Sequence, residues 1–188
     1  SYSKLDVISA LKGVGLRKGD IVFFSTSLGM VGKAEDVFTN DELNQLFLDC
    51  FRLVLGEEGT ILVPTYSYTF GESTSTELAC FDPDETVSRV GSFPEHVRKQ
   101  FDSRRTMDPM VSICGIGPVC AQLMSNLPPT SYGPDCVYER LVHMDVKICN
   151  IGLGPNWIPF LHYADAIENV PFRYNKLFFE IRSHFGSR

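Results

Sequence analysis

Hydrophobic and polar residues follow two different periods along the chain. Between residues 3 and 14, Leu5, Ile8 and Leu11 recur at helical spacing and form one apolar stripe. Elsewhere the apolar residues stand in short continuous runs, as expected for strands that are buried on both faces. The helical pattern predicts helices over residues 3–14, 41–56, 92–101, 118–127, 137–144 and 160–169. The continuous runs predict strands over residues 21–24, 59–68, 111–117 and 146–154.

Helices and strands alternate in this prediction, and their order indicates the fold class. Buried strands separated by helices are typical of a sheet with helices on both faces. We therefore expect an α/β protein, a three-layer α/β/α sandwich around a central sheet that is largely parallel or mixed. The chain has 188 residues, which suits one domain. No clear linker interrupts it, so we expect a single domain over residues 1–188.

The predicted helix over residues 41–56 has the strongest boundary signals. Asp41 is a candidate N-cap, and Gly56 stands just past the last apolar residue. By contrast, residues 71–91 are rich in Gly, Ser and Thr and are long for a loop. Long loops in compact domains are often functional, so this segment is a candidate part of a site.

The overall charge excludes several kinds of partner. The net charge is −6 and the pI about 5.2, whereas nucleic-acid binding depends on basic surface. No apolar run approaches the ~18 residues that cross a bilayer, and the N-terminus lacks the apolar core of a signal peptide. We expect neither a nucleic-acid nor a membrane partner. The basic residues Arg98, Lys99, Arg104 and Arg105 either hold a small anion or form a solvated helix face and loop.

Cysteine and histidine spacing does not indicate a metal site. None of the six cysteines belongs to a CxxC pair, and the four histidines are scattered. Cys114 and Cys149 lie in apolar runs and are expected to be small buried residues. We therefore expect no metal, and a reducing, cytoplasmic location. The motifs GxGxxG, GxxxxGK(S/T), HExxH and GxSxG are absent as well.

Hydroxyl side chains follow the first predicted strand. Ser25, Thr26 and Ser27 stand between that strand and the next glycines. Hydroxyls and free backbone N–H groups at a strand end form a site for an anion or a carbonyl oxygen, especially before a helix. The alternative is an ordinary serine-rich turn that caps a helix.

A second group of polar residues precedes the helix predicted at residue 92. Thr86, Ser88 and Arg89 could hold a phosphate or a sugar, and Gly91 allows a ligand to approach the backbone closely. The alternative is a series of turns, because Asp and Pro are frequent in this segment.

Titratable residues stand at two further element ends. Asp108 precedes Pro109 and a buried strand, where α/β sheets place ligands, although an Asx-type turn is the alternative. His162 and Asp165 are spaced i, i+3 and share a helix face. His162 lies near the helix N-terminus, where backbone N–H groups disfavour a positive ring, and Asp165 could orient that ring. The alternative is a packed, hydrogen-bonded histidine.

Six stretches, taken in order, resemble the aminoglycoside 3-N-acetyltransferase family in its wider sense of antibiotic N-acetyltransferase-like proteins. The resemblance covers roughly residues 5 to 175. It includes the family's Gly-Thr-Leu-hydrophobic-Pro-Thr strand, its Thr-x-Ser-Arg-x-Gly segment and its His-x-Ala-Glu helix. The six stretches are LRKGDIVFFSTSLGMVG, EEGTILVPTYSY, FDPDETVSRVGSFPEHVRK, RTMDPMVSICGIGP, SYGPDCVYERLVHMDVKICNIGLG and LHYADAIENVPFRY.

The resemblance implies an enzyme that uses acetyl-CoA to acetylate an amine of an amino sugar by direct transfer. His162 matches the catalytic histidine, which we expect to be the general base, and Asp165 replaces the usual Glu. Residues 25–27 match the loop that contacts the coenzyme, and we expect residues 86–91 nearby. The alternatives are a non-catalytic protein that binds coenzyme A or an amino sugar, and a thioester hydrolase.

Some positions depart from the family pattern on the side expected to face the acceptor. Ser25 and Asp108 stand where many members have His, and Val111 replaces a second His. Asp108 is our third candidate catalytic residue. Members associated with surface-polysaccharide synthesis look closer, so a polysaccharide precursor is a candidate acceptor beside an aminoglycoside. Family chains usually run longer, and we expect that a C-terminal portion is missing here; an oligomer is compatible with the sequence.

Overall fold

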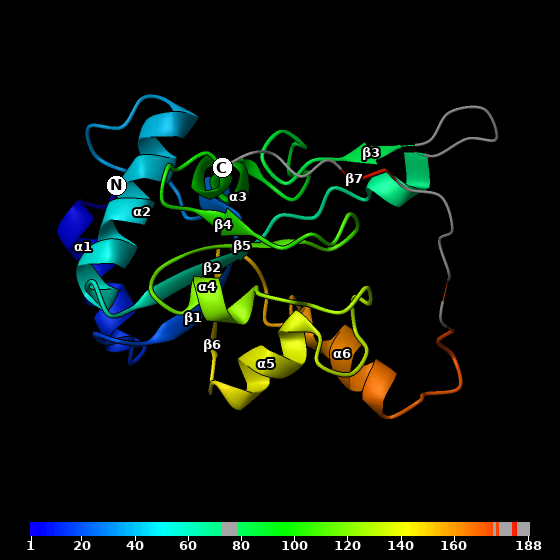
Figure 1. Ribbon diagram of the computed structural model, residues 1–188. Helices are drawn as coiled ribbons and strands as arrows, with labels where there is room; N and C mark the ends of the chain where they lie inside the picture. The colour runs from blue at the N-terminus through cyan, green and yellow to red at the C-terminus, as the bar shows by residue number, and fades with distance from the viewer. Residues whose placement is uncertain (73–78, 175, 177–181, 184–188) are drawn as a thin grey trace.

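A five-stranded mixed sheet forms the centre of the computed structural model, which describes residues 1–72, 79–174, 176, 182 and 183 (Figure 1). The strand order is β4-β5-β2-β1-β6. These strands are β1 (Ile21–Thr26), β2 (Thr60–Pro64), β4 (Arg104–Arg105), β5 (Ile113–Ile116) and β6 (Lys147–Ile151). A separate small sheet pairs β3 (Cys80–Phe81) with β7 (Arg182–Ser183).

The sheet combines parallel and antiparallel pairs. β1 lies between β2 and β6 and runs parallel to both, so that Phe23 stands opposite Leu62 on one side and Ile148 on the other. β5 pairs antiparallel with both β2 and β4. The central strands are therefore parallel and the β4 side of the sheet is antiparallel, which confirms the mixed-sheet prediction.

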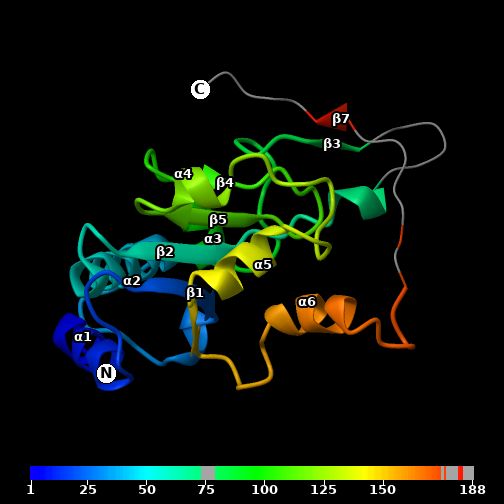
Figure 2. The same cartoon turned by 60° about the horizontal axis from the view of Figure 1, so that its bottom comes forward.

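Helices cover both faces of this sheet (Figures 1 and 2). Residues of α1 (Lys4–Gly13), α2 (Asn40–Leu55) and α3 (Ser92–Arg98) share one apolar core with the sheet. Residues of α4 (Cys120–Leu123), α5 (Val137–His143) and α6 (Phe160–Ile167) share the other.

Side chains of β1 alternate between the two cores. Phe24 enters the α1–α3 core, whereas Phe23 enters the α4–α6 core, as the period of two along a strand requires. The predicted three-layer α/β/α sandwich is therefore confirmed. No helix in the described part of the chain has both the length and the apolar character needed to cross a membrane.

Aromatic rings join β1 to two helices on the first face. The rings of Phe24 and Phe51 stack with centroids 3.9 Å apart. Phe51 also meets Phe93 edge to face, with centroids 5.4 Å apart. Aromatic pairs add about 0.5–1.5 kcal/mol beyond the burial of their area, so this group ties α2 and α3 to the sheet.

The N-cap of α2 differs from the one predicted. Thr39, not Asp41, caps the helix: its hydroxyl accepts the Glu42 N–H at 3.2 Å, and the Glu42 carboxylate accepts the Thr39 N–H at 2.9 Å. This reciprocal capping box satisfies two N–H groups at once, whereas Asp41 already lies inside the first turn. At the other end Gly56 has a φ of 67° and ends the helix, as predicted.

Most predicted elements are longer than the observed ones, and two differ most. The strand predicted over 59–68 ends at Pro64, since proline has no N–H for the ladder. The helix predicted over 118–127 is reduced to α4, which lies between positive-φ residues at Gly117 and Asn126.

The carboxyl ends of β1, β2 and β6 meet at one edge of the sheet because these strands are parallel. Gly152 follows β6 directly and has a φ of 68°. A Cβ atom there would lie 2.2 Å from the carbonyl oxygen of Ser27, so only glycine fits. The Ser27 N–H also donates to the Ile151 carbonyl at 2.8 Å. The loops after β1 and β6 are thus held together.

Candidate functional site

A pocket of about 460 Å³ opens at this edge of the sheet, within the size range of ligand sites. The loops that follow β1 and β2 form part of its wall. The rest comes from the segment that enters α3 and from the loop that leads to α6. Its lining includes Ser25, Ser27, Tyr66, Arg89, Trp157 and Pro159.

The predicted hydroxyl residues after the first strand all line this pocket. The side-chain oxygens of Ser25 and Thr26 are buried, and neither has a hydrogen-bond partner within the described residues. A buried polar group without a partner costs about 1–3 kcal/mol. These two oxygens can therefore gain a hydrogen bond when a polar ligand enters. The Ser27 N–H cannot, because the Ile151 carbonyl already accepts it.

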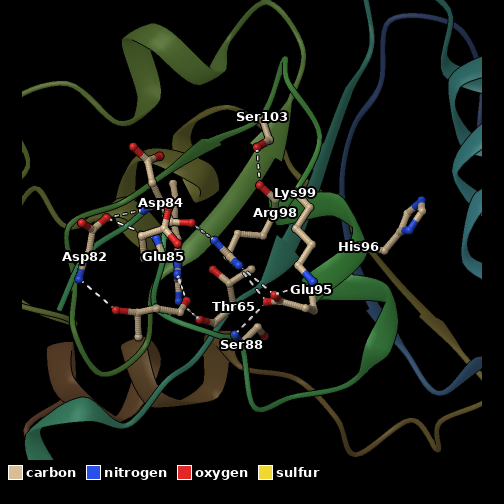
Figure 3. A network of polar contacts seen from close by, with 12 residues as sticks. Thr65, Asp82, Asp84, Glu85, Ser88, Glu95, His96, Arg98, Lys99 and Ser103 are labelled. Carbon is tan, nitrogen blue, oxygen red and sulfur yellow. Dashed lines mark hydrogen bonds and ion pairs between the residues drawn. The ribbon is translucent and has the colours of Figure 1, made fainter. Parts of the chain in front are cut away.

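A network of charged groups holds the segment that contains Thr86, Ser88 and Arg89, before α3 (Figure 3). The Arg98 guanidinium donates to both carboxylate oxygens of Glu95, at 2.9 and 2.7 Å, and also to the Asp84 carbonyl. Glu95 in turn accepts the Ser88 N–H at 2.9 Å. Burial raises the pKa of Glu95, but the hydrogen bonds from Arg98 and Ser88 outweigh it and lower that pKa. The network ties the segment to α3.

Arg105 holds the same segment from β4. Its guanidinium donates to the carbonyls of Pro83, Thr86 and Thr65 and lies 4.9 Å from the centroid of the Phe81 ring. Burial lowers the pKa of Arg105 to about 10. Lys99 also pairs with Glu95, at 3.5 Å. Three of the four basic residues considered as an anion site, Arg98, Lys99 and Arg105, therefore bind groups of the protein itself.

The segment places its three candidate residues differently. Arg89 lines the pocket, and its backbone N–H donates to the Tyr66 carbonyl at 2.8 Å. The buried hydroxyl of Ser88 has no partner in the described part of the chain. Thr86 is not among the described residues that line the pocket; its hydroxyl accepts the Asp82 N–H at 2.8 Å and closes a turn. The structure therefore supports a turn role for Thr86.

Asp108 forms the Asx-type turn that was its alternative interpretation. One oxygen of its carboxylate accepts the N–H groups of Met110 at 2.8 Å and Val111 at 2.9 Å. The turn lies against the loop after β2, because the Tyr68 N–H donates to the Met110 carbonyl at 3.2 Å. Asp108 is thus next to one wall of the pocket.

Tyrosines near the pocket were not predicted as functional residues. The Tyr66 and Tyr138 hydroxyls form a hydrogen bond of 2.7 Å. The Tyr132 ring lies 5.2 Å from that of Tyr138. Burial is the main cause that raises the pKa of all three hydroxyls, and the nearby Asp108 charge adds to it. The signal available in the sequence was the run TYSY directly after Pro64, which we interpreted as strand.

His162 lies in the first turn of α6, on its exposed side. The pocket reaches Pro159 at the start of this helix, but His162 is not among the described residues that line it. The His162 ring packs against that of Tyr132, with centroids 5.6 Å apart. The Asp165 carboxylate, which we expected to orient the His162 ring, pairs with Arg173 at 3.0 Å.

Trp157 is a further pocket residue that sequence analysis missed. Asn150, in β6, donates to the carbonyl oxygens of Trp157 at 2.9 Å and Gly154 at 3.1 Å. The loop that leads to α6 is therefore fixed to the sheet. Across the described residues, no three His, Cys, Asp or Glu side chains gather in a group that could hold a metal ion.

Comparison with known proteins gives a consistent result. The chain is 27% identical over 176 residues to aminoglycoside N(3)-acetyltransferase VII of Streptomyces paromomycinus, a match that covers 86% of this chain and 59% of that protein. It is 26% identical over 175 residues to aminoglycoside N(3)-acetyltransferase IX of Micromonospora chalcea, covering 85% and 60%. The chain thus spans less than two thirds of the length of either relative.

Solved structures show the same fold. AAC-VIa with bound sisomicin superposes with a TM-score of 0.77 at 29% identity, covering 88% of this chain and 65% of that one. AAC-IIIb in a binary complex with CoASH superposes with a TM-score of 0.78 at 21% identity, covering 90% and 66%.

The family comparison covers most of the chain. The model of the family described as aminoglycoside 3-N-acetyltransferase matches residues 26–182, which include Thr26 and Ser27, the segment of Thr86, Ser88 and Arg89 before α3, and helix α6. The chain therefore belongs to the aminoglycoside 3-N-acetyltransferase family.

Proposed function

We propose that this protein transfers the acetyl group of acetyl-CoA to an amine of an amino sugar. The observation that carries the proposal is the pocket at the carboxyl ends of the parallel strands, whose wall contains the buried, unpartnered hydroxyls of Ser25 and Thr26. Ligands of α/β proteins bind at this edge of the sheet. Family membership supports the reaction class, and a neighbour of the same fold was solved with CoASH.

The residues around the pocket fit a coenzyme with phosphate and amide groups. The hydroxyls of residues 25–27 can donate to or accept from these groups. Arg89, exposed at the pocket, suits a phosphate because a guanidinium binds two oxygens at once. Ser88 supplies a further buried hydroxyl beside it. We assign these residues to coenzyme binding and leave Thr86 to its turn.

His162 is the proposed general base. Only a free amine attacks a thioester, so the acceptor ammonium must first lose a proton, and a neutral imidazole can take the proton that the nitrogen releases. The amine nitrogen then forms a bond to the acetyl carbonyl carbon, the carbon–sulfur bond breaks, and the sulfur leaves as a thiolate that takes up a proton. The N–H groups of Leu28 and Gly29 are the candidate donors to the carbonyl oxygen, since that of Ser27 is engaged.

The acceptor is proposed as an amino sugar, either an aminoglycoside or a polysaccharide precursor. The AAC-VIa neighbour was solved with sisomicin bound, which supports an amino-sugar acceptor. Asp108 lies beside the pocket wall at Tyr68, where a carboxylate attracts the acceptor ammonium. Asp165, now paired with Arg173, is proposed to act only through the position of α6.

A thiol-release assay with a panel of amino sugars tests the proposal. We expect release that depends on the acceptor, and His162→Ala should lower turnover about 10²–10⁴-fold while the Kd for coenzyme A stays unchanged. His143→Ala is the matched control, because His143 is also exposed but ends α5. Release without an acceptor would indicate a thioester hydrolase. Coenzyme binding without release would indicate a non-catalytic binder, and an unchanged His162→Ala would exclude His162 as the base.

A further inference from the structure

Among the described residues, no polar group orients the imidazole of His162. In the described part of the chain neither ring nitrogen makes a hydrogen bond, and Asp165, the carboxylate one turn further on, is paired with Arg173 at 3.0 Å. A general base must nevertheless hold a fixed direction, because small displacements of a catalytic group lower the rate strongly. Some other contact must therefore limit the rotation of this exposed side chain.

The contact that does so is the ring of Tyr132. Its centroid lies 5.6 Å from that of the His162 ring, and the two planes are inclined by 51°. Tyr132 in turn packs against Tyr138, with ring centroids 5.2 Å apart. Tyr138 is fully buried and therefore provides a rigid support.

Tyr138 is also connected to the wall of the pocket. The Tyr138 hydroxyl is hydrogen-bonded to the Tyr66 hydroxyl at 2.7 Å, and Tyr66 lines the pocket. Tyr138 also packs edge to face on Phe160, the first residue of α6, with centroids 5.2 Å apart. The start of α6, the His162 ring and the pocket wall thus share one aromatic support.

We propose that Tyr132 is a positioning residue that sets the direction of the His162 imidazole relative to the coenzyme pocket. The inference rests on the proposed function of His162. A ring contact of this kind restricts the plane of the imidazole but fixes neither tautomer, so that either nitrogen can be the one that accepts a proton. A hydrogen-bonded carboxylate would instead occupy one nitrogen.

The proposal assigns the positioning role to the ring of Tyr132 and not to its hydroxyl. Because the contact is between rings, Tyr132→Phe should keep kcat within about threefold of wild type, whereas Tyr132→Ala should lower kcat about 10–100-fold. The KM for acetyl-CoA should change less than twofold in both variants, since Tyr132 is not among the described residues that line the pocket. Wild-type kcat in Tyr132→Ala, or an equal loss in Tyr132→Phe, would overturn the proposal.

Tyr163→Phe is the matched control for the docking of α6. Its hydroxyl donates to Glu139 at 3.0 Å on the buried side of the same helix, so this variant loosens α6 without touching the His162 ring. We expect kcat close to wild type. A loss equal to that of Tyr132→Ala would show that docking alone matters and would contradict the positioning role.

A measurement independent of activity keeps the proposal testable if Tyr132→Ala folds poorly. The ring current of Tyr132 should displace the His162 ring-proton signals in NMR spectra, and this displacement should persist in Tyr132→Phe and disappear in Tyr132→Leu. Its absence in the wild type would contradict the contact. If His162→Ala is fully active, the proposed function of His162 fails. If His162→Ala is inactive but Tyr132→Ala is unaffected, only the present inference fails.

Discussion

The hydroxyl oxygens of Tyr66 and Tyr138 lie 2.7 Å apart, although 72 residues separate them in the chain. This hydrogen bond joins the loop after β2 to α5, and the Tyr138 side chain is fully buried. Two hydroxyls that satisfy each other in an apolar setting depend on each other, because the loss of one leaves the other without a partner.

Tyr138→Phe should therefore lower the free energy of unfolding by about 1–3 kcal/mol, measured by urea denaturation. The double variant with Tyr66→Phe should lose little more than the single one, because the Tyr66 hydroxyl that lost its partner is then absent as well. Losses that simply add in the double variant would show that the two hydroxyls do not stabilise each other.

Ser25→Ala should stabilise the fold and weaken the binding of the coenzyme. The Ser25 hydroxyl is buried and lacks a partner within the described residues, so its removal should raise the free energy of unfolding by about 1 kcal/mol. If that hydroxyl binds the coenzyme, the KM for acetyl-CoA should rise about 2–10-fold. Thermal or urea denaturation and steady-state kinetics measure the two effects.

Ser112→Ala is the control for the gain in stability that we expect from Ser25→Ala. Ser112 is equally buried, but its hydroxyl donates to the Thr65 carbonyl at 2.8 Å and accepts from Arg105 at 3.0 Å. Its removal should lower stability. An unchanged KM in Ser25→Ala would remove Ser25 from the coenzyme site, and a lower stability would show that its hydroxyl already has a partner.

The strands that were predicted correctly are those with a strong apolar signal. Residues 21–24 form part of β1, and they are apolar without a break because helices cover both faces of the sheet. β4 was missed because it consists of only Arg104 and Arg105. The antiparallel direction of β5 could not be predicted, since hydrophobic periodicity carries no information on the direction of a neighbouring strand.

The site was predictable only where its residues are neighbours in the chain. Residues 25–27 were identified because hydroxyls directly follow the apolar run over residues 21–24. The contact between Tyr132 and His162 joins two separate segments, and periodicity does not determine how α6 is rotated against the α5 region. Asp165 was assigned to His162 by helical spacing, but Arg173, eight residues further on, reaches it instead.

Thr39→Ala should test the corrected start of α2. The Thr39 hydroxyl accepts the Glu42 N–H at 3.2 Å, and replacing such a cap by Ala lowers stability by about 1 kcal/mol. Thr39→Ser should retain most of the effect of the cap. Asp41→Ala should have a smaller effect, because the exposed Asp41 carboxylate adds charge to the first turn and pairs with His96 Nδ1 at 3.0 Å but does not cap the helix. If Thr39→Ala left the free energy of unfolding unchanged in urea denaturation, Thr39 would not be the cap.

Stability should fall in alkaline solution because two thiols are buried. Cys114 and Cys120 are 0% and 1% exposed, and burial raises their pKa to about 11 and about 12. An unfolded thiol loses its proton near pH 8.5, so between that pH and the folded pKa the native state binds more protons than the unfolded chain. Their contribution to stability is complete below about pH 8.5 and is lost as pH rises through the folded pKa.

Cys120→Ala should reduce this pH dependence. Between pH 8 and pH 10 the wild type should lose about 1–2 kcal/mol more of its free energy of unfolding than the variant does, measured by urea denaturation at both values. Leu123→Met is the matched control, because Leu123 is fully buried in the same helix and does not titrate. It should change stability equally at the two pH values. An identical pH dependence in Cys120→Ala and the wild type would show that the Cys120 thiol titrates alike in the folded and unfolded chains.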